Sequence, residues 1–144
     1  MDKKHWIVVE NRQSAGGHHD RTKLEAPCGY VCKDGAIYLL YEETAGVRAT
    51  IKLQGGKVTL LRGNTRLELE EGRRCHCQYD AGCGFLALET EAKSIRADFR
   101  PDGGVARLNY DLWSAGQLLS HNAVTIRITE QRFKPDRAKV PKGS

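Results

Sequence analysis

Apolar and polar residues alternate along most of the chain, and glycine-containing turns interrupt the alternation roughly every eight to twelve residues. In residues 47–54 every second position is apolar: Val47, Ala49, Ile51 and Leu53. Gly55-Gly56 follows, and a glycine pair supplies the positive φ angles of a two-residue hairpin turn. Alternation of this kind is typical of a strand with one face in the core. Its recurrence predicts roughly ten antiparallel strands.

The same pattern indicates how these strands are arranged. No segment shows a convincing apolar stripe at helical spacing, so the prediction is all-β. An open meander would expose two edge strands, and closing the sheet removes both edges. A β-sandwich is the competing solution, but it needs Greek-key crossovers that the short hairpin links do not favour. We therefore predict a single antiparallel up-and-down β-barrel domain over residues 1–130 and a basic flexible tail over 131–144.

Composition supports one globular domain. The chain has 144 residues, of which 40% are hydrophobic and 28% charged. No apolar run approaches the ~18 residues of a membrane span, and the apolar stretch near the N-terminus is shorter than the ~7–15 residues of a signal peptide. The five cysteines are an odd number, which favours reduced thiols over a disulfide framework. We expect a cytoplasmic protein with no membrane association.

The positive charge is unevenly distributed. The formal net charge is +5, and residues 131–144 alone carry +4, which leaves +1 for residues 1–130. A nucleic-acid-binding domain concentrates basic residues on its folded surface. Nucleic acid is therefore not an expected partner of the barrel, and weak association through the tail is the form that such binding would take.

A series of motifs in the second part of the chain resembles a known family. The motifs, in order, are Tyr38 to Glu43, Thr50 to Lys52, Val58 to Gly63, Glu71-Gly72, Tyr79 to Gly84, Ala106 to Leu112, Gly116 to Leu118 and Asn122 to Ile128. In order and spacing they are similar to the bacterial YwiB-like family, a domain family of unknown function. The resemblance implies a calycin-like or lipocalin-like β-barrel and brings no catalytic residues. Shape alone suggests a ligand cavity without identifying the ligand.

The alternation places several polar side chains on the inner face. If Val58 and Leu60 face inward, Arg62 does as well, and the same parity applies to residues on four other strands. The predicted inward set is Tyr41, Glu43, Arg62, Tyr79, Tyr110 and Asn122. A buried arginine needs Glu43 or an anionic ligand, so these residues would suit a small carboxylate or phosphate compound. The alternative is that Arg62 pairs internally and the tyrosines belong to the core.

The other polar motifs in the sequence do not indicate a catalytic activity. Cys75 and Cys77 would share one face of a strand with His76 on the other, so the three cannot bind one metal ion there. The run His18-His19-Asp20 lies in a glycine-rich segment that we interpret as an exposed loop. No nucleophile elbow, zinc-protease motif or phosphate-binding loop is present. We predict no catalytic residues, no metal site and no cofactor.

Three hypotheses of function follow. The first is a non-enzymatic barrel that binds a small anionic or amphipathic molecule. The second is a packed barrel that acts as a protein-interaction module, with a protein partner or a second copy of the chain. The third is nucleic-acid association through the tail. Cavity volume separates the first two, because a small barrel can be filled by its own side chains.

Overall fold

The computed structural model describes residues 5–44, 46–80 and 84–130, and these residues form ten β-strands. The strands are β1 (His5–Ala15), β2 (His18–Lys33), β3 (Ala36–Thr44), β4 (Val47–Gln54), β5 (Lys57–Arg62), β6 (Thr65–Glu70), β7 (Arg74–Asp80), β8 (Phe85–Arg100), β9 (Gly103–Ser114) and β10 (Gln117–Glu130). The segment His18 to Asp20, which we expected to be a loop, instead begins β2. The predicted tail at 131–144 lies outside the described residues.

Each strand pairs antiparallel with the next along the chain, and β1 pairs with β10 to close the barrel. The predicted antiparallel up-and-down barrel is therefore confirmed. Closure leaves no free strand edge in the sheet. Within the described ranges, no helix is long and apolar enough to cross a membrane.

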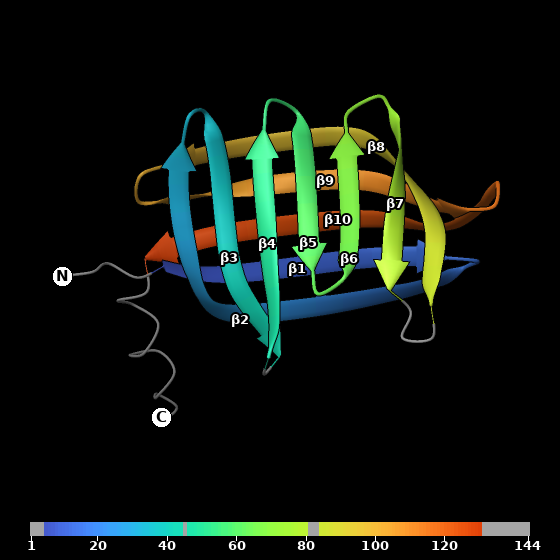
Figure 1. The fold of residues 1–144 in the computed structure, drawn as a ribbon, viewed down its shortest axis with the longest axis horizontal. Helices are drawn as coiled ribbons and strands as arrows, with labels where there is room; N and C mark the ends of the chain where they lie inside the picture. Colours follow the sequence, from blue (N-terminus) through green and yellow to red (C-terminus); the bar gives the residue numbers. More distant parts are fainter. Residues whose placement is uncertain (1–4, 45, 81–83, 131–144) are drawn as a thin grey trace.

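The barrel is flattened into two layers whose strands run across each other (Figure 1). Strands β3 to β7 form the front layer, and β8, β9, β10 and β1 run behind them. The two longest strands, β2 and β8, each have 16 residues and bend from one layer into the other. In β8 the register with β9 shifts between Ala92 and Ser94. An irregularity of this kind bends a strand, which lets β8 turn the corner of the barrel.

Inner and outer residues alternate as the sequence indicates. In β4, Ala49, Ile51 and Leu53 are buried and alternate with more accessible polar residues. The interior is packed with side chains toward the end where β1 begins. Core residues of this packed end are Ile7, Ala26, Cys28, Leu39, Ile95, Ala106 and Ile128. Burial of aliphatic side chains, each worth about 1.5–3 kcal/mol, is the main stabilising contribution here.

An aromatic group covers the packed end. The ring of Tyr30 lies 5.0 Å from that of His5 and 6.0 Å from that of Phe99, and its hydroxyl donates a 2.5 Å hydrogen bond to the Arg100 carbonyl. Close by, the β8–β9 hairpin approaches so tightly that a Cβ at Gly104 would lie 2.2 Å from the Asp98 carbonyl oxygen. Only glycine fits at such a backbone approach. The β2, β8 and β9 ends are thereby held together.

The seam between β6 and β7 is the least regular part of the wall. A single register pair, Arg66 with Gln78, joins the two strands. Side chains bond the backbone of Glu68 instead: its amide donates to the Cys77 thiol at 3.2 Å, and the Thr90 hydroxyl donates to its carbonyl. Both side chains are buried. They satisfy backbone groups that a regular ladder would have paired.

Candidate functional site

A cavity of about 670 Å³ occupies the part of the barrel that is not filled by the core. All ten strands contribute to its lining, and most of the lining is aliphatic. The apolar lining residues are Val9, Leu24, Ile51, Val58, Leu60, Leu67, Leu69, Leu86, Leu88, Leu108, Leu112, Leu119, Val124 and Ile126. An apolar hollow of this size with a few polar groups is the usual form of a small-molecule site.

The polar part of the lining contains every residue of the predicted inward set. Tyr41, Glu43, Arg62, Tyr79, Tyr110 and Asn122 all line the cavity. Their positions thus agree with the parity argument, while their binding of a ligand stays a prediction. Lys23 and Thr22 of β2 lie on the same lining.

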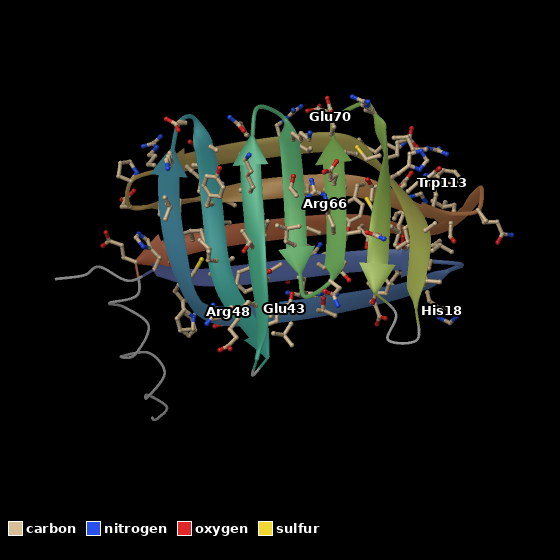
Figure 2. The ribbon with its side chains drawn as sticks, viewed as in Figure 1. His18, Glu43, Arg48, Arg66, Glu70 and Trp113 are labelled. Atoms are coloured by element: carbon tan, nitrogen blue, oxygen red, sulfur yellow. The ribbon has the colours of Figure 1, made fainter. Side chains whose placement is uncertain are left out.

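Arg62 and Glu43 form an ion pair at this lining. The Arg62 Nη1 donates to the Glu43 Oε2 at 3.3 Å, and the two side chains are 35% and 20% exposed. Glu43 lies near the end of β3 (Figure 2), and Arg62 is the last residue of β5. Ala49 of β4 lies directly between the two strands, paired with Tyr41 on one side and Arg62 on the other. Glu43 lies two residues beyond Tyr41, where the register of β3 with β4 shifts between Glu42 and Thr44.

Two tyrosines next to this pair remain protonated at neutral pH. Burial raises the pKa of Tyr41, and the Glu43 carboxylate raises it further, while the Arg62 charge acts in the opposite direction. Burial likewise raises the pKa of Tyr110, which is also within reach of the Arg62 charge. Neutral phenol groups both donate and accept hydrogen bonds. Neither hydroxyl bonds to a described residue, so both can bond to a molecule in the cavity.

A second polar group lies where β1 and β10 meet. The Asn11 Nδ2 donates to the Asn122 Oδ1 at 3.5 Å, and the Asn122 Nδ2 donates to the Ser120 Oγ at 3.0 Å. The Asn11 Oδ1 is buried and has no partner among the described residues. A buried acceptor without a partner is costly.

Asn11 and its neighbour Gln13 line the cavity but were not among the predicted residues. Their signal was present in the sequence. They continue the every-second-residue series that Ile7 and Val9 begin, so parity places all four on the inner face.

The cysteines and histidine of β7 lie as the alternation predicts. Cys77 is buried and Cys75 half-buried, whereas the His76 side chain is 86% exposed and lies 3.4 Å from the Glu89 carboxylate. The described part of the chain holds no group of three or more His, Cys, Asp or Glu residues placed to bind a metal ion. Cys83 lies outside the described residues.

The arrangement suits binding of an amphipathic anion. Apolar walls can hold a hydrocarbon or ring system, and Arg62 with two phenol groups can hold a carboxylate or phosphate group. The described cavity lining contains no histidine, cysteine or serine, the side chains that most often act as bases and nucleophiles.

Comparisons with known proteins agree with the resemblance in the sequence. The family model "Domain of unknown function (DUF1934)" matches residues 7–126, so the match includes the first strands as well as the motifs noted above, up to the middle of the last one. The crystal structure of the ywiB protein from Bacillus subtilis superimposes with a TM-score of 0.80 at 21% identity, covering 89% of this chain and 92% of that one. No curated protein matches the chain. The predicted YwiB-like family is confirmed.

Proposed function

The chain belongs to the family described as a domain of unknown function (DUF1934), and we propose that its barrel is a non-enzymatic binding protein for a small amphipathic anion. The observation that carries the proposal is the cavity of about 670 Å³, which combines aliphatic walls with one arginine and two unbonded phenol groups. Sites for small molecules usually have volumes of roughly 300–1,000 Å³ and a few convergent polar groups.

The cavity volume supports ligand binding over the packed-barrel hypothesis. A small barrel that serves only as a scaffold can fill its interior with side chains, as this one does at the end containing Ile7 and Leu39. A hollow elsewhere in the same barrel gives up packing contacts that would stabilise the fold. A bound molecule would restore those contacts.

The polar groups define how the ligand would be oriented. Its anionic group lies against Arg62 and the hydroxyls of Tyr41 and Tyr110, and its apolar part lies along the leucines of β5, β6 and β9. Arg62 is already paired with Glu43, so an anion must compete with that carboxylate. This competition favours ligands that add apolar burial to the charge interaction.

A cytoplasmic location is part of the proposal. It is supported by the cysteines of the described residues, since Cys28, Cys32, Cys75 and Cys77 are all free thiols.

Native mass spectrometry of the full chain, as purified from cells, tests the proposal. The informative variant is Arg62→Leu, and Arg66→Leu is its matched control, because Arg66 pairs with Glu68 on the exposed surface of the neighbouring strand (Figure 2). We expect a small molecule to accompany the wild-type chain and the Arg66→Leu variant and to be lost from Arg62→Leu.

Bare masses for all three proteins, with no adduct formed when long-chain carboxylates are added, would contradict the proposal. That result would favour the packed barrel acting through a protein partner.

A further inference from the structure

A second hollow, of about 660 Å³, is lined by residues of β1, β2, β8, β9 and β10. Its ionisable lining residues are Arg12, Arg21, Lys93, His19, His121, Asp20 and Asp111. Gln13, Tyr110 and Asn122 line both this hollow and the inner cavity, so the two share part of the wall. We call this second site the basic hollow. Its arginines, lysine and histidines do not line the inner cavity.

The most ordered feature of the basic hollow is a histidine held by a buried carboxylate. Asp111 lies on the outer face, yet it is only 7% exposed. His121 is its direct partner on β10, and the His121 Nδ1 lies 2.6 Å from the Asp111 Oδ1. Lys93 lies 3.7 Å from the other carboxylate oxygen. Because Asp111 holds Nδ1, the second ring nitrogen, Nε2, is left for a ligand, and it bonds to no described residue.

The Asp111–His121 pair belongs to a row of directly opposed residues that extends across β1 and β2. His121 pairs with Ser14 of β1, and Ser14 pairs with His19 of β2. Directly opposed residues have Cβ atoms about 4.5–5.5 Å apart, so the three side chains are neighbours on one face. Together they offer two imidazoles and a hydroxyl, all of which can donate hydrogen bonds.

Two arginines face each other beside this row. Arg12 pairs directly with Arg21 across β1 and β2, and like charges in that position repel. Arg21 is neutralised by an ion pair with Glu10. Arg12 has no hydrogen bond or ion pair with a described residue. The hollow also contains the Asp20 carboxylate, but no ion pair joins it to Arg12 among the described residues, so the Arg12 guanidinium is left for a ligand.

We propose that the basic hollow binds the phosphate group of a small molecule. The Arg12 guanidinium supplies a bidentate charge-assisted contact, and Ser14 and His19 supply further donors. The His121 Nε2 is a donor only in the imidazolium form, because the Nδ1 proton is held by Asp111. Asp111 acts as a positioning residue that fixes the His121 ring. The volume exceeds that of a phosphate ion, so the hollow accommodates a phosphate monoester with a small organic group.

The test is an NMR titration of the ¹⁵N-labelled full chain with inorganic phosphate, and with glycerol phosphate as a simple monoester. Chloride at equal ionic strength measures the nonspecific salt effect. We expect saturable shifts of the His121 and His19 ring nitrogens with both phosphates. Tighter binding of glycerol phosphate than of inorganic phosphate would identify a phosphate monoester as the class of ligand. Equal binding of the two would identify free phosphate as the ligand.

Matched variants locate the site. Arg12→Gln and His121→Gln change exposed side chains, and each is expected to weaken phosphate binding by about tenfold. Arg107→Gln is the control, because Arg107 also opposes an arginine, Arg96, on the outer face but lies outside the hollow. Arg96, like Arg21, has its own carboxylate partner, Glu71.

The outcomes separate this proposal from the inner ligand site. The Arg62→Leu variant is expected to keep the full phosphate response, because Arg62 lines only the inner cavity. Three results would overturn the proposal. Chloride could reproduce the shifts, Arg12→Gln could leave them unchanged, or Arg107→Gln could weaken phosphate binding as much as Arg12→Gln does. A response lost only in Arg62→Leu would assign the phosphate to the inner cavity instead.

Discussion

Arg62 and Glu43 are joined by a 3.3 Å ion pair on the lining of the barrel cavity. The pair neutralises the arginine in the absence of a ligand. It also sets up a competition, because an anionic ligand and Glu43 would bind the same guanidinium.

This competition predicts opposite effects for two variants. Glu43→Gln should raise the affinity for an anionic ligand by several-fold, because the guanidinium no longer has a charged partner. Arg62→Leu should lower it by about tenfold or more, the loss of one charge-assisted contact. Equilibrium titration with the same anion measures both. A loss of affinity in Glu43→Gln would show that the carboxylate itself contacts the ligand.

The irregular seam between β6 and β7 predicts a stability effect at Cys77. Cys77→Ala leaves the Glu68 amide without its buried acceptor, which should cost about 1–3 kcal/mol. Urea denaturation measures the loss. Cys75→Ala on the same strand is the control, because its side chain is only half-buried, and it should cost less. Equal losses would mean that the thiol contact does not stabilise the seam.

Thiol reactivity should follow burial. Burial raises the pKa of Cys28 to about 11, so at pH 8 only about one thousandth of it is thiolate, the reactive form. Burial raises the pKa of Cys77 as well, whereas Cys32 is exposed. Iodoacetamide labelling followed by peptide mass spectrometry should therefore modify Cys32 first among the four cysteines that the structure describes. Early labelling of Cys28 would mean that the packed end opens readily.

The buried tyrosines predict a loss of stability in alkali. Burial raises the pKa of Tyr41 and Tyr110 above the value of about 10 that they have in the unfolded chain. Above that pH the unfolded chain releases these protons while the folded barrel keeps them. Stability is therefore full below about pH 10 and falls as the pH rises, by up to about 1.4 kcal/mol per pH unit for each group.

Tyr41→Phe removes one of these protons, so its urea midpoint should fall less steeply with pH than that of the wild type. Identical slopes would show that Tyr41 ionises as easily in the folded state as in the unfolded state.

Much of the fold and the cavity could be predicted because a barrel translates sequence parity directly into inside and outside. Val58, Leu60 and Arg62 show the logic: once two residues are inward, the third must follow. The same rule also covered Asn11 and Gln13, but a polar residue in a first strand gives no sign of where the hydrophobic core ends and the cavity begins.

The basic hollow could not be predicted, because it depends on which residues face each other across different strands. Asp111 and His121 are ten positions apart, and only the β9–β10 register brings them together. Ser14 joins them through the closure of β1 on β10, the longest-range pairing in the chain. Alternation and the short turn would set the β9–β10 register, but an irregularity between Leu118 and Ser120 shifts it by one residue, and nothing in the alternation marks that shift.

Fluorescence titration with 1-anilinonaphthalene-8-sulfonate tests the central claim, ligand binding inside the barrel, most directly. This aromatic sulfonate has an apolar body and one anionic group, as the cavity requires. Leu60→Trp fills the cavity, and Leu61→Trp is its matched control, because Leu61 is 40% exposed on the outer face of the same strand. We predict one binding site in the wild type and in Leu61→Trp, and none in a folded Leu60→Trp. Undiminished binding by Leu60→Trp would contradict the account.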